Sequence, residues 1–253
     1  EVRMIPSRGG PAPSIHVFAP RAQLRRPQLA SLTQTPHAQR THHDRYTGLR
    51  TDLAPPTHGE QTYPETMSDI IIPGIGSLEP APALDHLDLL APPVAAALTA
   101  LAERGVATAS SALVVAIDPE LADTEVMTRE FGMDLALSSN CILVAGKRAG
   151  EERIAACVVR ATTNADVNHV VKKRLDVRKA SFWPQERAVE ASGMEYGGIT
   201  PVGVPGSWRL LIDSACSVGW SCIGSGLRRS KLFVTGEVLA ALPGAEIVEG
   251  LGV

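Results

Sequence analysis

The sequence predicts an α+β domain built on a mixed β-sheet. Apolar residues at helical spacing and short β-type runs follow one another in irregular order. Two of the β-type runs have the spacing of a hairpin. The regular alternation of strand and helix that a doubly wound sheet requires is missing. Residues 67–253 are enough to enclose one hydrophobic core.

Residues 1–66 differ in composition from the rest of the chain. They contain 9 of the 19 prolines, 5 of the 7 histidines and 8 arginines but no lysine, with almost no apolar periodicity. Such a segment cannot bury enough apolar surface to offset the entropy lost on ordering. We therefore expect a disordered leader or tail at 1–66 and the folded domain at 67–253. An arginine-rich RNA-binding arm is the functional alternative to a solvated tail.

The first half of the domain opens with a predicted helix over residues 84–104. Apolar residues recur there at three- and four-residue steps, and Pro92 and Pro93 fit a turn before the helix proper. A strand, a second helix and a hairpin follow. We assign these to residues 112–117, to 122–131, and to 141–145 with 154–161.

The second half is marked by glycine and proline signals. The polar segment 146–150 has glycine at both ends and is assigned to the hairpin turn. Residues 166–175 have an amphipathic helical pattern, and Pro184 begins a short helix over 184–192. The remaining assignments are strands at 177–182, 210–212, 222–223, 231–234 and 245–248, and a last helix at 236–242.

The cysteine and histidine patterns argue against a metal site and against secretion. The four cysteines include no C-x-x-C pair, and three lie in apolar runs, as buried free thiols of a reducing compartment do. His86 and His169 have no partners at metal-ligand spacing. No apolar run reaches the roughly 20 residues of a membrane span, and residues 1–30 lack a signal-peptide core. We expect a cytoplasmic protein with no metal and no membrane partner.

Two glycine-rich segments are candidate ligand-binding loops. Gly197–Gly203 combines glycines, which allow close backbone approach, with a proline that fixes the chain. It could present N–H groups to an oxyanion, and an ordinary tight turn is the alternative. Gly224–Gly226, followed by basic residues, could contact phosphate, although a hairpin turn explains it equally well. Asp213 ends an apolar run, where a carboxylate can cap a turn or orient an amine.

These segments together resemble the YbaK family of aminoacyl-tRNA editing domains, which includes domains associated with prolyl-tRNA synthetase. The string GGITPVG at 197–203 is similar to the family's GGxTPxG loop. A helix with the paired lysines Lys172 and Lys173 precedes it. The run 211–213, the glycine turn, a strand, a helix and a final strand follow in the family's order. The resemblance extends from Leu113 to Val248.

The resemblance implies a mixed, partly barrel-like sheet flanked by helices. It also implies a hydrolase that clears the ester of mischarged tRNA without a metal or organic cofactor. The expected partners are the aminoacylated 3′ end of tRNA and an aminoacyl-tRNA synthetase. The glycine–proline loop would form the floor of the pocket, and Asp213 and the second glycine turn would lie at its other side. The implied substrate-binding residues are Gly197, Gly198, Ile199, Thr200, Pro201, Asp213, Gly224, Ser225 and Gly226.

One position departs from the family pattern. The family has a lysine just before the first hairpin strand, and aligning that strand with Cys141–Val144 places Asn140 there. Asparagine keeps a hydrogen-bond donor but loses the charge. With Asn140 as the candidate catalytic residue, the chain is a divergent deacylase, or a module that binds an aminoacyl group, amino acid or protein partner without hydrolysis.

The charge balance of the domain limits how it can bind tRNA. Residues 67–253 contain 16 basic and 22 acidic residues, a net charge of 16 − 22 = −6, whereas tight RNA binding relies on lysine and arginine. Weak binding, or recruitment by a synthetase, fits this balance. Two local basic patches could still contact tRNA, namely Lys172, Lys173, Arg174, Arg178 and Lys179, and Arg228, Arg229 and Lys231.

Overall fold

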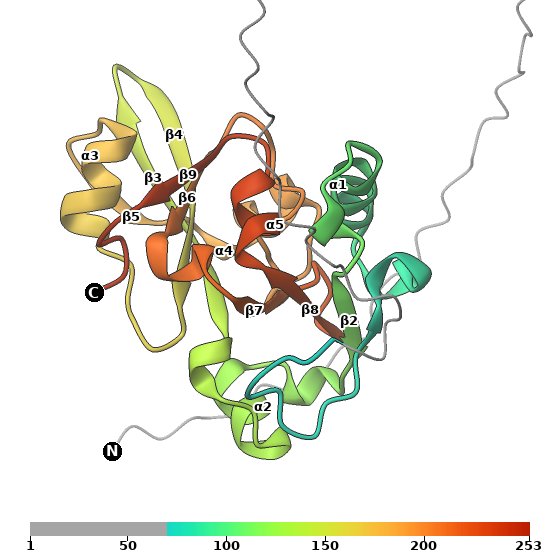
Figure 1. Cartoon of the computed structure of the whole chain (residues 1–253). Coiled ribbons are helices and arrows are strands. Elements are labelled where there is room, and N and C mark those ends of the chain that lie inside the picture. Colours follow the sequence, from blue (N-terminus) through green and yellow to red (C-terminus); the bar gives the residue numbers. More distant parts are fainter. Residues whose placement is uncertain (1–69) are drawn as a thin grey trace, which may run out of the picture. The chain divides into compact units, whose positions relative to one another are not determined.

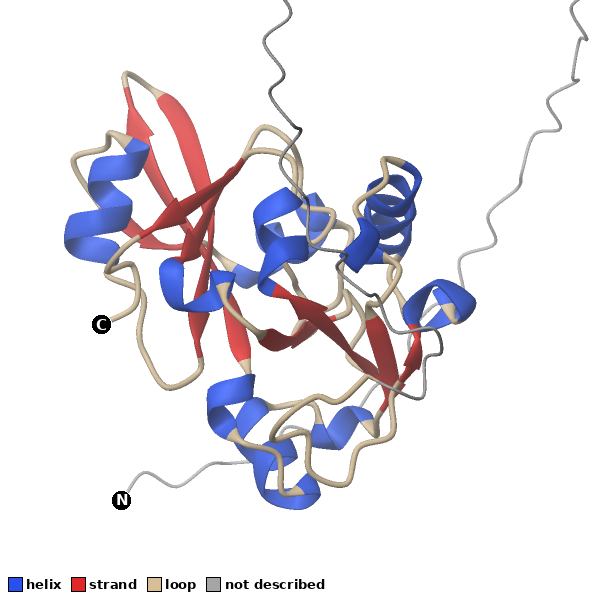
Figure 2. Cartoon of the chain, viewed as in Figure 1, coloured by secondary structure: helices blue, strands red, loops and turns tan. Residues whose placement is uncertain are grey.

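The computed structural model describes residues 70–253, so the expectations for residues 1–66 lie outside the described part of the chain. Within 70–253 the strands form two sheets with helices packed against them, which confirms the α+β class (Figure 1, Figure 2). The strand order is β1-β2-β8-β7 in the first sheet and β5-β3-β4-β6-β9 in the second.

The first sheet is antiparallel and is covered on both faces. Alternate residues of β8 point to opposite sides. Phe233 packs in one cluster with Met127 of α2, whereas Leu232 and Val234 belong to the main core together with Leu98 of α1. The strands are β1 (Ala81–Pro82), β2 (Leu113–Ala116), β7 (Trp220–Gly224) and β8 (Ser230–Thr235).

The second sheet is mixed. The β3–β4 hairpin is antiparallel, whereas β6 pairs in parallel with both β4 and β9. One face joins the main core, and on the other face Cys157 packs with Val171 and Leu175. The strands are β3 (Ser139–Arg148), β4 (Glu151–Arg160), β5 (Ala180–Phe182), β6 (Arg209–Asp213) and β9 (Ala245–Val248).

Two helices differ from the sequence prediction. The segment predicted as one helix over 84–104 has two 3-10 turns before the α-helix, because the paired prolines lack N–H donors and fit only the first turn. The segment 166–175 begins with a π-helical turn, where the Asp166 carboxylate accepts a hydrogen bond from the His169 N–H. The α-helices are α1 (Pro92–Glu103), α2 (Thr124–Phe131), α3 (Lys172–Leu175), α4 (Gln185–Ser192) and α5 (Gly236–Ala241).

The predicted hairpin is present, but its turn is shorter than the assigned segment 146–150. Only Ala149 and Gly150 form the turn, and both have positive φ. Gly146 lies inside β3, paired with Ala180 of β5. A Cβ at Gly146 would lie 2.5 Å from the carbonyl oxygen of Lys179, so this glycine permits close strand packing rather than a turn.

Candidate functional site

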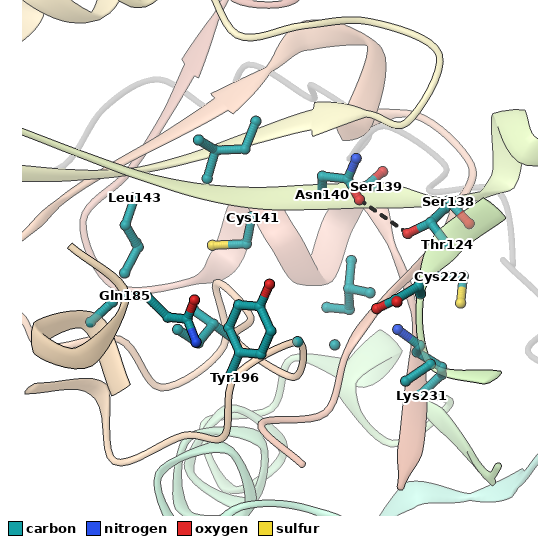
Figure 3. Close-up of a pocket in the computed structure, with 18 of the residues that line it drawn as sticks. Thr124, Ser138, Ser139, Asn140, Cys141, Leu143, Gln185, Tyr196, Cys222 and Lys231 are labelled. Atoms are coloured by element: carbon teal, nitrogen blue, oxygen red, sulfur yellow. Dashed lines mark hydrogen bonds between the residues drawn. The ribbon is translucent and has the colours of Figure 1, made fainter. Parts of the chain in front are cut away.

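A pocket of about 450 Å³ lies where the two sheets approach each other. Its walls come from the starts of β3 and α2, the loop after α4, and strands β7 and β8 (Figure 3). Ser138 forms a β-bridge with Cys222. The Arg160 guanidinium of β4 donates to the Trp220 carbonyl (2.9 Å) and the Ser221 hydroxyl (3.0 Å). These bonds join the two sheets beside the pocket, whose volume suits a small ligand or the end of a larger one.

Asn140 lies in the pocket wall, within β3 rather than just before it. Its backbone is in register with Val159 of β4, and its side chain is partly exposed. The Asn140 Oδ1 accepts a hydrogen bond of 3.4 Å from the hydroxyl of Thr124, the first residue of α2. Within residues 70–253 no hydrogen-bond partner occupies the Asn140 amide nitrogen. Its two N–H donors can therefore serve a ligand.

The two predicted glycine turns contact each other through their backbones. A Cβ at Gly224 would lie 2.2 Å from the Gly198 carbonyl oxygen, and one at Gly198 would lie 2.7 Å from the Leu227 backbone. The Gly226 N–H donates to the Gly198 carbonyl (2.8 Å), and the Gly198 N–H donates to the Glu195 carbonyl (3.0 Å). Only glycine fits this contact, and both of these N–H groups are used within the protein.

The structure brings four of the sequence-predicted site residues together and places the others elsewhere. The four that line the pocket are Asn140, Gly197, Ile199 and Gly224. Gly198 lies behind the wall in the backbone contact just described. The remaining predicted residues do not line the pocket; they are Thr200, Pro201, Asp213, Ser225 and Gly226.

Asp213 and Ser225 have structural partners that account for their positions. The Asp213 carboxylate accepts hydrogen bonds from the N–H groups of Ala215 (2.9 Å) and Gly252 (2.7 Å), so it caps the turn after β6. The Ser225 hydroxyl lies 2.8 Å from the hydroxyl of Ser230 across the β7–β8 hairpin. At Gly224–Gly226 the structure therefore contains the hairpin turn, which was the alternative to a phosphate-binding loop.

Lys231 is a charged pocket residue that the sequence did not place in the site. The sequence predicts it to lie in a basic patch with Arg228 and Arg229 that could contact tRNA, but it is only 7% exposed and lines the pocket. Burial lowers the pKa of the Lys231 ammonium from its usual value of 10.5. The strand period could have indicated this position, because Lys231 is two residues from Phe233 and therefore faces the same buried side.

Two thiols also line the pocket, Cys141 on β3 and Cys222 on β7. Burial raises the pKa of both, that of Cys222 to about 12. A protonated thiol is a poor nucleophile, so these side chains act as apolar wall at neutral pH. All four cysteines are free thiols.

Aromatic side chains stand at the pocket on the side of β5 and the loop after α4. Phe182 is 68% exposed and Tyr196 is 58% exposed, and both line the pocket. Trp183 also lines the pocket; it is buried and packs edge-to-face on Trp208 with ring centres 5.2 Å apart. Exposed aromatic faces beside a buried support can stack on an unpaired nucleobase.

Other candidate features lie away from the pocket. The His169 side chain is 85% exposed and pairs with Asp166. Among residues 70–253 no three His, Cys, Asp or Glu side chains group as a metal site would. In the same part of the chain, no helix is both long and apolar enough to cross a membrane.

Comparison with known proteins gives one family match. Residues 118–242 match the family model of the aminoacyl-tRNA editing domain. No curated protein sequence matches the chain.

Solved structures with a similar fold include the following two. One is a protein proposed to be a trans-editing enzyme for prolyl tRNA synthetase, with 19% identity and a TM-score of 0.51, covering 63% of this chain and 97% of that chain. Another, from work on epitope backbone grafting onto scaffold proteins, has 18% identity and a TM-score of 0.51, covering 65% and 99%. At these identities the likeness establishes a shared fold.

Proposed function

Because residues 118–242 belong to the aminoacyl-tRNA editing domain family, we propose that this chain is a free-standing deacylase that hydrolyses the ester of mischarged tRNA. The family match confirms the resemblance to YbaK-type domains and supports a role in tRNA editing. The observation that carries the finer proposal is the pocket itself. Asn140, Gly197 and Ile199, which lie far apart in the sequence, meet around one cavity of about 450 Å³.

The proposed reaction needs little covalent chemistry from the protein. An aminoacyl ester is already activated, so holding it beside a water can supply much of the rate. The water oxygen adds to the ester carbonyl carbon, the bond to the ribose oxygen breaks, and a free amino acid and a tRNA 3′ end are released. The Asn140 amide can donate to the carbonyl oxygen or to a ribose hydroxyl. The tRNA's own neighbouring hydroxyl can assist the water, and we propose no cofactor for this step.

We propose the aminoacylated 3′ end of tRNA as the ligand. Phe182 and Tyr196 offer aromatic faces on which an unpaired terminal base can stack. The net charge of −6 over residues 67–253 disfavours tight binding of a whole tRNA, so contact would be transient or assisted by a synthetase. This activity belongs in the cytoplasm, where tRNA is charged.

A direct assay tests the proposal. The purified chain is incubated with tRNAs mischarged with several small amino acids, and ester loss is compared with the spontaneous rate. We expect acceleration by the wild type and a loss of about 10²-fold in Asn140→Ala, the usual scale for one oxyanion donor. Asn168→Ala is the matched control, because Asn168 is exposed and lies outside the pocket. No acceleration with any substrate would remove the proposal.

A second candidate function is binding without hydrolysis. Asn140 motivates it, because asparagine stands where the family has a charged lysine. Asn140→Lys separates the two candidates. A gain of deacylation from an inactive parent favours a lapsed enzyme that now binds an aminoacyl group or amino acid, whereas loss of an existing activity assigns a catalytic role to the asparagine.

A further inference from the structure

Lys231 is the single buried charge of the pocket. Of the described residues that line the cavity, only Asp123 and Lys231 are charged. The Asp123 side chain is 66% exposed and pairs with Arg228 at 3.2 Å. Lys231 is 7% exposed and lies on the central part of a sheet, opposite Val115 of β2 and Gly224 of β7.

The Lys231 ammonium has no partner among residues 70–253. No carboxylate lies within 4.0 Å of it there, and no described residue accepts a hydrogen bond from it. Figure 3 shows Tyr196 and Lys231 on the side of the pocket across from Asn140 and Cys141, with the amine end of Lys231 directed into the cavity. The lysine side chain is mostly removed from bulk water and its ammonium faces the pocket without a charged partner, so a ligand that carries or develops negative charge there would compensate it.

Two backbone donors of the loop region are already used. The N–H groups of Gly198 and Gly226 bond to carbonyl groups of the protein. Several donors remain free at the pocket, among them the Asn140 amide, the Ser138 hydroxyl and the Trp183 Nε1–H, and the Lys231 ammonium is the only one of the lining donors that carries charge. A ligand atom that becomes negative during the reaction would gain most from the lysine.

We propose that Lys231 binds the carbonyl oxygen of the ester and stabilises the negative charge on it as water adds to the carbonyl carbon. This rests on the proposed deacylase function. The electrons of the carbonyl bond move to the oxygen that Lys231 contacts, then return as the bond to the ribose oxygen breaks and that oxygen takes a proton. The net change is ester plus water to amino acid plus 3′ hydroxyl. Lys231 keeps its proton throughout and acts in its charged form.

The test compares Lys231→Met, Lys231→Arg and a matched Lys147→Met in the full chain. Lys147 is exposed near the hairpin tip at the far end of β3 from Asn140. We expect Lys231→Met to lose about 10²–10³-fold in deacylation rate. Lys231→Arg should retain more of the rate than Lys231→Met, because it keeps the charge, and Lys147→Met should match the wild type.

The pH dependence of the deacylation rate distinguishes a lysine that acts on the substrate from one with only a structural role. Asp123, Arg228 and the Cys222 thiol are the titratable or charged groups that act on Lys231 from the neighbouring elements. With spontaneous hydrolysis subtracted, the wild-type rate should fall as pH rises through the lowered pKa of Lys231. In Lys231→Arg that fall should be absent over the same range, because arginine stays protonated.

The outcomes are distinguishable. If the wild type is active and Lys231→Met is equally active, the role of Lys231 is overturned and the deacylase function stands. A rate that instead rises through the same pH range indicates a neutral amine acting as a base, and also overturns it. A wild type inactive with every substrate removes both proposals. If Lys231→Met does not fold, the pH–rate profiles of the wild type and Lys231→Arg still test the proposed role of Lys231.

Discussion

Lys231 places a titratable group where the strand pattern calls for an apolar residue. Desolvation lowers its pKa, the Cys222 thiol and Asp123 oppose that shift, and Arg228 adds to it. The unfolded chain keeps the usual value near 10.5, so between the lowered pKa and 10.5 the unfolded state binds more protons than the folded state. Between these two pH values, the contribution of Lys231 to the free energy of unfolding rises with pH. Below the lowered pKa, the folded state bears the full cost of burying the charge.

Removing this charge should therefore stabilise the fold at neutral pH. We expect Lys231→Met to raise the Tm by roughly 2–4 °C at pH 7, which corresponds to about 1 kcal/mol in a domain of this size. The gain should shrink as pH rises from the lowered pKa toward 10.5, and wild-type Lys231 is neutral in both states only above that pH. Thermal unfolding across pH measures both effects, with Lys147→Met as the control expected to stay unchanged. A lower Tm for Lys231→Met at every pH would mean that the ammonium has a stabilising partner.

The exposed aromatics allow substrate binding to be separated from chemistry. Tyr196→Ala and Phe182→Ala should each weaken binding of the aminoacylated 3′ end by roughly tenfold or more, the scale of one base–aromatic stack. KM should rise while kcat changes much less, because neither ring contacts the ester in the proposed arrangement. Tyr196→Phe should keep its affinity, since stacking needs the ring rather than the hydroxyl.

Steady-state kinetics on a short aminoacylated 3′-end mimic measures this split. Val218→Ala is a suitable control, because Val218 is 72% exposed and lies outside the pocket. An unchanged KM in both alanine variants would show that the terminal base binds elsewhere.

At the scale of elements, the pocket depends on contacts between segments that are distant in sequence. The loop at Gly197–Gly198 and the turn at Gly224–Gly226 touch through backbone atoms, and Ala91, just before α1, donates its N–H to the Ser225 carbonyl at 3.0 Å. These positions require glycine, because a Cβ atom would collide with neighbouring atoms of the chain. Gly224 and Gly198 do not have a positive φ, so their need for glycine comes from the neighbouring chain alone.

A methyl group in that contact should therefore be costly. Gly224→Ala would place a Cβ 2.2 Å from the Gly198 carbonyl oxygen, so the two turns must separate. We expect a loss of about 1–3 kcal/mol in the free energy of unfolding, the usual range for overpacking. Urea unfolding would measure it, with Gly206→Ala as the matched control, because a Cβ at Gly206 meets nothing within 4 Å. Equal stability of the two variants would show that the turns do not rely on this close approach.

Local signals explain which elements the sequence could predict. The β3–β4 hairpin, α4 after Pro184 and both glycine turns follow from proline, glycine and apolar spacing within about ten residues. The division of the strands between two sheets does not, because it depends on pairings such as β2 with β8 over more than a hundred residues. The site shows the same limit. The sequence predicts Asn140 and the glycine loop as site residues, and Asn140, Gly197 and Ile199 line the pocket, but the inward direction of Lys231 and the capping role of Asp213 depend on long-range packing.

At the scale of the whole molecule, the folded unit extends beyond the family match at residues 118–242. The segment before it supplies β1, α1 and β2 of the described structure. The Ser230 hydroxyl donates to the Leu89 carbonyl (2.6 Å), and Arg229 donates to the Asp88 carbonyl (2.7 Å). Ile72, only 6% exposed, packs in the same cluster as Phe233 of β8. The folded unit therefore includes Ile72, and its start at residue 67 stays a prediction.

Two truncations test that boundary. The chain 67–253 should keep the Tm and the deacylation rate of the full chain, because it retains every buried contact of the described part, and residues 1–66 have the composition of a segment that builds no core. The chain 118–253 keeps the family match but loses β2 from the middle of the first sheet together with α1, so we expect it not to fold cooperatively. Circular dichroism melting and limited proteolysis distinguish these outcomes. A drop of several degrees in the Tm of 67–253, where ~2–4 °C corresponds to about 1 kcal/mol, would mean that residues 1–66 contribute buried contacts and that the boundary lies earlier in the chain.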